Sequence, residues 1–171
     1  ATAFPLDAFL SEIDQLWQRG VRNFKFIDRT FNLKITTSIA ILEFFLQRMS
    51  DDLYLHFEVV PDNLPDKLKS VLQKFPPNSL QFEIGIQTFD SEIQERISRK
   101  QNNDKSKDNI RWLREHSGAH LHTDLIFGLP GDTLYIHAAF PNNTFAINLD
   151  TLEIIWHYEP QQNFDVTVPV M

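Results

Sequence analysis

The stretch Leu80-Gln81-Phe82-Glu83-Ile84-Gly85-Ile86 decides the fold of this chain. Its β-branched and aromatic residues predict a strand. A helix is predicted on each side of it: residues 64–75 form the first, which ends at Pro76-Pro77, and residues 91–98 form the second. A strand between two helices indicates crossover connections, which are typical of parallel sheets.

The same alternation of strand and helix runs along most of the chain. Strands are predicted at residues 24–27, 53–60, 80–86 and 121–127. Helices are predicted at residues 6–19, 35–49, 64–75, 91–98 and 104–116. This order predicts a parallel α/β unit, either an open sheet or part of a barrel, with helices on the outer face.

The pattern changes after Gly131. Short strands are predicted at residues 133–139, 144–149 and 153–158, divided by turn residues. Such an order is typical of antiparallel β structure, although these strands are too few to close a core alone. The charge changes as well, because all 16 Lys and Arg residues lie before residue 115. We therefore expect two modules, residues 1–132 and residues 133–171.

Composition argues against several classes of protein. The 171 residues carry a net charge of −7, and nucleic-acid binding requires clustered Lys and Arg. No apolar run approaches the roughly 20 residues of a membrane span, and no signal peptide is apparent. We therefore expect a cytoplasmic protein that binds neither membrane nor nucleic acid. The absence of cysteine excludes disulfides, thiolate zinc sites and thiolate-held iron–sulfur clusters within these residues.

Polar residues stand at or just after the carboxyl ends of the predicted parallel strands: Asp28, Glu58, Gln87 and Asp124. Ligand sites of parallel α/β folds gather at this end of the sheet. Structural explanations remain open, because Glu58 could point to solvent or bond a loop, and Gln87 could cap a loop instead of holding a ligand. Gly85 within a strand indicates close approach by a ligand or another backbone.

Two further segments follow these strands. Arg99 is predicted to end the short helix after Gln87, where its guanidinium could hold a carboxylate or could simply be solvated at a helix end that favours cations. The segment Gly128-Leu129-Pro130-Gly131 permits close backbone approach to a ligand. It is not a phosphate loop, because Gly-Lys-Ser/Thr is absent.

His120, His122 and Asp124 alternate along the last parallel strand, so they share one of its faces. Three such side chains could bind a metal ion. A row of this kind is more often a hydrogen-bonded part of the strand, and we predict no metal site.

Four parts of the chain carry a recognisable pattern in a recognisable order. They are Phe24-Lys25-Phe26-Ile27-Asp28-Arg29-Thr30-Phe31-Asn32, then Phe57-Glu58-Val59-Val60-Pro61-Asp62, then Gly85-Ile86-Gln87-Thr88-Phe89-Asp90 with Ile97-Ser98-Arg99-Lys100-Gln101, and last Asp124-Leu125-Ile126-Phe127-Gly128-Leu129-Pro130-Gly131. Together they resemble the radical S-adenosylmethionine (SAM) superfamily, over about residues 1–132. The first two resemble its members that contain a cobalamin-binding domain.

The resemblance implies a partial (β/α)6 barrel with a [4Fe–4S] cluster held by a Cys-x3-Cys-x2-Cys loop. In that family the cluster chelates SAM, and reduction cleaves the sulfonium to give a 5′-deoxyadenosyl radical. The resemblance also implies which residues bind SAM. Arg99 would pair with its methionine carboxylate, Asp124 and Gln87 would meet polar parts of the cofactor, and Glu58 would assist them.

Three further positions follow from the same resemblance. Ile126 and Gly128 would flank the adenine of SAM. Asp28 would lie near the amino group of the cofactor, although Asp28-Arg29-Thr30 departs from the Gly-Gly-Glu that is usual in the family. No residue of this chain replaces the cysteines, so we expect their loop to precede residue 1 and the chain to be catalytically inactive by itself. The barrel would also lack its first and last strands, and open sheet edges favour self-association.

The tail resembles a different family. Residues 134–150, continuing to Trp156, are similar to pyrroloquinoline-quinone (PQQ)-dependent methanol dehydrogenases, which are eight-bladed β-propellers of the periplasm. Ala146-x-Asn148-x-x-Thr151-x-x-x-x-Trp156 resembles their blade-docking tryptophan motif, with Leu152 at a position where Gly is usual. No quinone or calcium ligand of that family can be assigned. Two families in one chain indicate a fused or misassembled reading frame, or else one natural domain with an unusual tail.

The expected fold class is α/β: a parallel partial (β/α) barrel fragment of radical SAM type with a short antiparallel β appendage. The leading hypothesis is a fragment of a radical SAM enzyme, methyltransferase-like in its parent, which forms at most part of the SAM pocket. A fragment is also indicated by the start at Ala-Thr-Ala without Met. The alternatives are a non-catalytic binding or assembly module that pairs its strand edges with a partner, and a fragment of a PQQ-dependent alcohol dehydrogenase.

Overall fold

The computed structural model of the chain describes residues 5–27, 30–126, 128–129, 131, 133–138, 143–148 and 150–158. The chain divides into two compact units. The first unit contains Ala1–Phe89 and Lys100–Leu125, and the second contains Asp90–Arg99 and Ile126–Met171.

The first unit is built on a four-stranded sheet in the order β1-β2-β3-β4, with every neighbouring pair parallel. Its strands are β1 (Asn23–Lys25), β2 (Tyr54–Val59), β3 (Leu80–Gln87) and β4 (His120–Leu125). The strand order follows the sequence order, as expected when each crossover places its strand beside the previous one. The predicted parallel α/β architecture is therefore confirmed.

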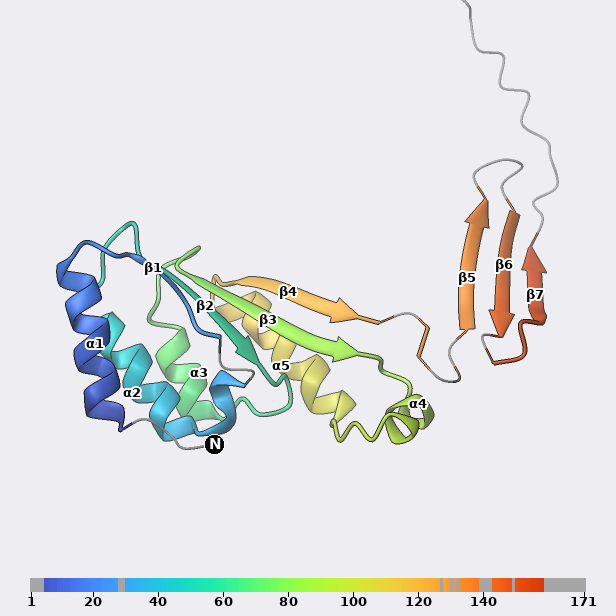
Figure 1. Cartoon of the computed structure of the whole chain (residues 1–171), viewed down its shortest axis with the longest axis horizontal. Coiled ribbons are helices and arrows are strands. Elements are labelled where there is room, and N and C mark those ends of the chain that lie inside the picture. Colours follow the sequence, from blue (N-terminus) through green and yellow to red (C-terminus); the bar gives the residue numbers. More distant parts are fainter. Residues whose placement is uncertain are drawn as a thin grey trace, which may run out of the picture. The chain divides into compact units, whose positions relative to one another are not determined.

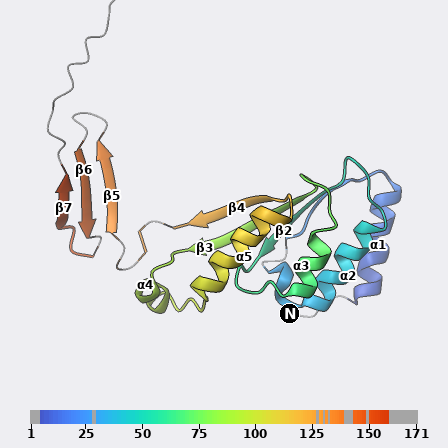
Figure 2. The same ribbon diagram turned by 180° about the vertical axis from the view of Figure 1, so that it is seen from behind.

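Helices cover one face of this sheet, and Figures 1 and 2 show the arrangement from opposite sides. They are α1 (Leu6–Gln18), α2 (Ile35–Leu46), α3 (Asp66–Leu72) and α5 (Asn103–His116), with a short 3-10 helix at Phe31–Leu33. In the described part of the chain no helix is long and apolar enough to cross a bilayer. Among the described residues of the first unit, no helix lies on the opposite face of the sheet.

The core lies between the sheet and its helices. Burial alternates along β2 and β3, and the buried positions include Leu55, Phe57, Phe82 and Ile84. Phe57 is fully buried and stacks on Phe31, with ring centroids 3.9 Å apart. Such aromatic packing contributes both buried apolar area and favourable ring geometry.

The second unit contains the short helix α4 (Ser91–Arg96) and a three-stranded antiparallel sheet. The sheet has the order β5-β6-β7, formed by β5 (Thr133–Ala138), β6 (Asn143–Asn148) and β7 (Ile154–Tyr158). The tail was predicted as antiparallel β structure, and its described residues adopt it.

The turn between β6 and β7 explains one oddity of the tail sequence. The Asn148 side-chain oxygen accepts hydrogen bonds from the backbone N–H groups of Asp150 and Thr151, at 2.8 and 3.0 Å. Leu152 then takes a φ of 60°, in the left-handed region that glycine adopts without strain. The position where the methanol dehydrogenase motif usually has Gly is therefore one where the backbone favours Gly.

Candidate functional site

The uncovered face of the four-stranded sheet carries most of the polar strand residues. Strand neighbours in register share a face, and the register pairs Glu58 with Glu83, Glu83 with His122, and Gly85 with Asp124. Because the alternate residues of β2 and β3 are buried under the helices, these five residues lie on the side without helices. We call this surface the polar face.

Glu83 lies at the centre of a cluster on the polar face. Its carboxylate oxygen Oε1 accepts a 2.8 Å hydrogen bond from Gln81 Nε2 and lies 3.2 Å from His122 Nδ1. The same oxygen lies 3.0 Å from His56 Nε2, a contact that is close without hydrogen-bond alignment and therefore acts through charge. Tyr54 donates from its hydroxyl to the Gln81 side-chain oxygen, which orients the Gln81 amide toward Glu83.

This cluster perturbs the ionisation of Glu83. Burial by itself raises the pKa of Glu83, because it disfavours the charged form. The hydrogen bond from Gln81 and the charges of His122 and His56 act in the opposite direction and outweigh burial. The pKa of Glu83 is therefore lowered, and Glu83 is a fixed negative charge at neutral pH.

Glu58 and Asp124 are carboxylates of a different kind. Among the described residues, neither carboxylate forms a side-chain hydrogen bond or an ion pair, and Asp124 is exposed. Gly85 lies beside Asp124 in the register, and a Cβ placed on Gly85 would meet no atom within 4 Å. Toward the carboxyl ends of its strands, the polar face therefore holds two acidic groups around open space. This arrangement suits a cationic or hydrogen-bonding ligand.

A buried asparagine fixes the loop that follows β2. Asn32 is fully buried, and its side chain donates to the Val60 and Asn63 carbonyl oxygens at 2.8 and 2.6 Å. The Val60 N–H donates in return to the Asn32 side-chain oxygen at 2.8 Å. Asn109 from α5 adds a 2.9 Å bond to the Pro61 carbonyl. The carboxyl end of β2, which presents Glu58, is thereby held rigid from two sides.

The structure brings together some of the predicted site residues. Glu58 and Asp124 share the polar face. Gln87 ends β3 at a shift of register, with a φ of 65°. Asp28 lies outside the described residues.

Arg99, Ile126 and Gly128 belong to the second unit. Arg99 was predicted to end the short helix, but α4 ends at Arg96 and Arg99 follows the turn at residues 97–98. The reason is Ser98, whose φ of 56° reverses the chain so that the Arg99 N–H donates to the Gln94 carbonyl at 2.7 Å. Gly128 has a φ of 88°, which glycine adopts without strain.

Metal binding finds no support in the described part of the chain. No group of three His, Cys, Asp or Glu side chains there has the geometry of a metal site. His120, His122 and Asp124 do share one face through the register, but His122 is engaged with Glu83.

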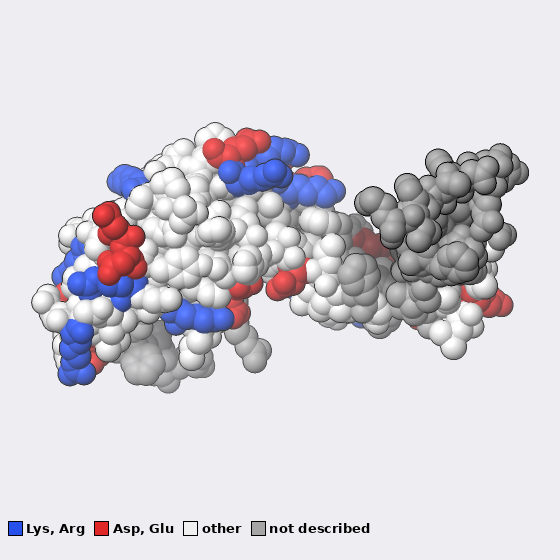
Figure 3. All heavy atoms as spheres, turned by 90° about the horizontal axis from the view of Figure 1, so that it is seen from above, with Lys and Arg blue, Asp and Glu red and all other residues white. Residues whose placement is uncertain are grey.

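On the surface drawn in Figure 3, Lys and Arg lie next to Asp and Glu, and charges of both signs are interspersed.

These observations define a class: a parallel α/β unit with helices on one face and unpaired acidic groups on the other. Residues 1–135 of the chain match the radical SAM superfamily. The match spans most of the 171 residues, and the chain belongs to this superfamily.

Solved structures support the fold. The chain resembles the radical SAM methyltransferase TsrM from Kitasatospora setae, solved with tryptophan substrate and a SAM analogue, at a TM-score of 0.62. A second structure of TsrM, with cobalamin and a [4Fe–4S] cluster bound, matches equally well. The identity is 20%, and the match covers 75% of this chain and 26% of TsrM. At this identity the likeness shows the fold alone.

Curated relatives match shorter parts of the chain. The haem chaperone HemW of Bacillus subtilis is 34% identical over 93 residues, which cover 54% of this chain and 24% of HemW. The putative dehydrogenase XoxF of Paracoccus denitrificans is 40% identical over 73 residues, covering 38% of this chain and 11% of XoxF. The lanthanide-dependent methanol dehydrogenase of Methylorubrum extorquens is 40% identical over 60 residues. The chain thus spans only a minor part of each relative.

Sequence reasoning missed the centre of the polar face. Glu83 and His56 were not singled out, because their partners come from neighbouring strands and depend on the register. One signal was available in the sequence. Two neighbouring strands that each alternate apolar and polar residues indicate that their polar side chains form a row on one face of the sheet. The role of Asn32 was also missed, although the residue stands within the first family-like segment.

Proposed function

We propose that the polar face forms part of the SAM pocket of a radical SAM enzyme. Membership of the superfamily supports this proposal, and so does the position of Glu58 and Asp124 at the carboxyl end of parallel strands. The observation that carries it is the pair of unpaired carboxylates around the open space at Gly85. Gln87, at the end of β3, would supply an amide to the same ligand.

The chemistry of SAM fits these residues. SAM carries a positive sulfonium and a positive amino group, and both interact favourably with carboxylates in a partly desolvated site. The ribose hydroxyls suit an amide such as that of Gln87. Gly85 leaves room for the ligand to approach the backbone. From the family resemblance we further propose Arg99 for the methionine carboxylate, Ile126 and Gly128 for the adenine, and Asp28 for the amino group.

The iron–sulfur cluster of the family does not fit these residues. Its ligands are thiolates, and the chain contains no cysteine. We therefore propose that the 171 residues bind SAM weakly and carry out no radical step by themselves. The parent enzyme would be cytoplasmic and of the cobalamin-binding type, with methyl transfer as its reaction class, as in the TsrM fold relative. Cysteines at family spacing in the adjoining reading frame would support this assignment, and their absence would contradict it.

Isothermal titration calorimetry with SAM tests the proposed pocket. We expect a dissociation constant on the order of 1 mM, because the iron contact is missing. Gly85→Val should abolish this binding while leaving the fold intact, since a Cβ added at this position meets no atom within 4 Å. Gly85→Ala is the smaller matched variant and should weaken binding less.

S-adenosylhomocysteine serves as the control ligand, because it lacks the methyl group and the positive sulfonium. It should bind several-fold more weakly than SAM if the carboxylates of Glu58 and Asp124 recognise charge. Equal affinity of Gly85→Val and the unchanged chain for SAM would contradict the proposal. Binding tighter than about 1 µM would show that the cluster contributes less than we assume.

A second candidate function is an assembly module. Within the described residues, β4 pairs with β3 only, and such an open edge can accept a strand from another chain. Size-exclusion chromatography with light scattering distinguishes the two candidates. A stable dimer would support assembly, whereas a monomer of 20.0 kDa at all concentrations would count against it.

A further inference from the structure

Glu83 and His122 form a carboxylate–imidazole pair in the middle of the polar face. His122 Nδ1 lies 3.2 Å from the Glu83 oxygen Oε1, and the two residues are register partners on β4 and β3. The pair is therefore set by the register of two strands that bond one another, and it does not depend on what lies beyond β4. We call it the Glu83–His122 dyad.

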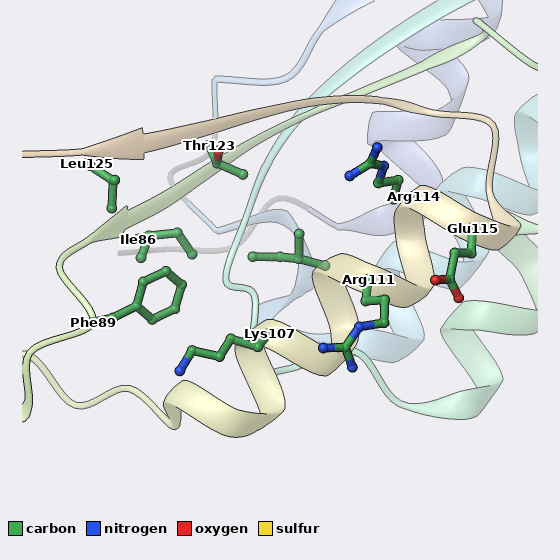
Figure 4. Close-up of a pocket in the computed structure, with 9 residues that line it drawn as sticks. Ile86, Phe89, Lys107, Arg111, Arg114, Glu115, Thr123 and Leu125 are labelled. Atoms are coloured by element: carbon green, nitrogen blue, oxygen red, sulfur yellow. The ribbon is translucent and has the colours of Figure 1, made fainter.

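The alternation of side chains along β4 directs His122 away from the helices. Thr123 and Leu125 line one cavity together with Ile110 of α5, and Figure 4 shows both β4 residues on the side of the sheet that faces α5. His122 is next to Thr123 in the strand, so its ring projects from the opposite face. A molecule bound on the polar face can therefore reach this ring.

The members of the cluster around Glu83 differ in how far solvent reaches them. The side chain of His122 is 56% exposed, whereas that of Glu83 is 25% exposed and that of His56 is 12% exposed. His56 Nε2 is a buried atom, so it offers no contact to a ligand. His122 is therefore the imidazole of this cluster that a substrate can touch.

The neighbours of His122 determine which ring nitrogen carries the proton. Nδ1 lies 3.2 Å from the Glu83 carboxylate and 3.3 Å from the Gln81 amide nitrogen. That amide already donates to Glu83 at 2.8 Å, and a lone pair on Nδ1 would be repelled by the carboxylate. A charge-assisted bond from Nδ1–H to Glu83 is therefore favoured. This tautomer leaves the lone pair on Nε2, which has no partner among the described residues.

The charges around the dyad restrict the groups that can approach it. Glu58 lies in the same row of the sheet as the dyad, on the other side of Glu83. Asp124 lies two residues beyond His122 on β4, roughly 7 Å away. Among the described strand residues of the polar face, Lys25 is the one Lys or Arg, and it lies on β1 at the far edge of the sheet. The field near His122 therefore repels anions and favours neutral or cationic hydrogen-bond donors.

We propose that His122 is a general base for a substrate bound on the polar face, and that Glu83 is its positioning residue. A neutral or cationic N–H or O–H group of the substrate gives its proton to His122 Nε2, and the electron pair of the broken bond stays on the substrate atom. Glu83 holds the ring in the tautomer that accepts at Nε2 and stabilises the imidazolium that forms. The substrate would lie beside the proposed SAM pocket, but the dyad is testable without SAM, so the two proposals can fail separately.

Long-range 1H–15N correlation spectra of the full chain show which nitrogen of each neutral imidazole carries the proton. We expect the Nδ1–H tautomer for His122. His120 is the internal control, because it lies on the same face of β4 without a carboxylate contact among the described residues, and it should show the Nε2–H tautomer. Glu83→Ala should return His122 to Nε2–H. An Nε2–H tautomer of His122 in the unchanged chain would overturn the proposal, whether or not the variant folds.

Acylation by diethylpyrocarbonate compares the reactivity of the exposed imidazoles. At pH 7, His122 should react at least about threefold faster than His120, because the carboxylate stabilises the positive charge that develops on the ring. Glu83→Gln keeps the shape of the side chain and should remove this difference, whereas Glu12→Gln on α1 is the matched control and should preserve it. Tandem mass spectrometry locates the modified residue. Equal rates for the two histidines in the unchanged chain would mean that the dyad is a structural contact only.

Two small aromatic probes test the class of substrate. Benzylamine presents a cationic N–H donor, and benzoate presents a carboxylate on a ring of the same size. In amide chemical-shift titrations, benzylamine should shift residues around His122 and bind several-fold more tightly than benzoate. His122→Ala should weaken benzylamine binding. Benzoate binding as tight as that of benzylamine, or no shift near His122 with either probe, would contradict the assigned substrate class.

Discussion

The two faces of the four-stranded sheet are made by alternate residues of the same strands, yet they differ in burial and in polarity. On the helix-covered face, Leu55, Phe57 and Phe82 are almost entirely buried. On the polar face, Glu58 and Asp124 lie without partners among the described residues, and Glu83 is held by neighbours. Packing stabilises the helix-covered face. The polar face carries unpaired carboxylates that folding does not require.

This difference indicates that the helix-covered face determines stability and that the polar face is the place to look for ligand binding. A core residue contributes to stability through burial, so its replacement costs free energy of unfolding. An unpaired carboxylate at a strand end contributes little to stability, and its position then needs another explanation such as ligand binding. The two faces can therefore be separated by measuring stability and binding on paired variants.

The largest expected effect is on the covered face. Phe57→Ala should lower the free energy of unfolding by about 3–5 kcal/mol, because it leaves a cavity beneath the Phe31 ring. Glu58→Ala, at the adjacent position, should change it by less than about 0.5 kcal/mol. Urea denaturation followed by circular dichroism measures both. Equal losses of stability in the two variants would contradict the claim that only the helix-covered face contributes substantially to stability.

The next effect concerns the loop that supports the polar face. Asn32→Ala should cost about 2–3 kcal/mol, because it leaves the Val60 N–H and the Val60 and Asn63 carbonyls without their buried partner. Asn23→Ala on the exposed part of β1 is the control and should cost little. If both asparagines matter equally in urea denaturation, Asn32 does not hold the loop as described.

Glu83 contributes a smaller, pH-dependent effect. Its pKa is lowered on folding, so its stabilising contribution is present above the ordinary value of 4.5 and is lost as pH falls through the lower folded value. Glu83→Gln should lower the free energy of unfolding at pH 7 by about 1 kcal/mol. It should also reduce the further decrease in this free energy as the pH falls. Urea denaturation at pH 7 and at about pH 3.5 compares the two proteins. Parallel pH profiles would show that the cluster does not stabilise the charged form.

The smallest effect on stability is expected where the effect on binding is largest. Glu58→Gln and Asp124→Asn keep the shape of each side chain and should change stability by less than about 0.5 kcal/mol. Each should nevertheless weaken SAM binding several-fold, because the positive charge of the ligand loses a partner. Calorimetry of both variants checks this. A large loss of stability without loss of binding would reverse the assignment of these residues.

Much of the fold could be predicted from the sequence, because strand and helix signals are local. The turns at Pro76-Pro77 and Gly118 divide the elements, and the predicted elements lie within a few residues of those observed. Arg99 was misplaced because the left-handed turn at Ser98 is not encoded by a glycine. Leu152 adopts a similar backbone against its own preference.

The candidate site could be predicted only in part. Glu58 and Asp124 were singled out because strand ends are readable along the sequence, and their role in binding stays a prediction. The cluster around Glu83 depends on the register between β2, β3 and β4, which no single strand encodes.

The most direct test of the polar face is a titration of the 15N-labelled chain with SAM, followed by amide chemical shifts. We predict shifts confined to the carboxyl ends of β2, β3 and β4, centred on Glu58, Gly85 and Asp124, and absent from the Gly85→Val variant. Shifts that gather instead around Lys107 and Arg111 of α5, on the helix-covered side of the sheet, or no shifts at several millimolar SAM, would contradict the assignment of the polar face as a cofactor surface.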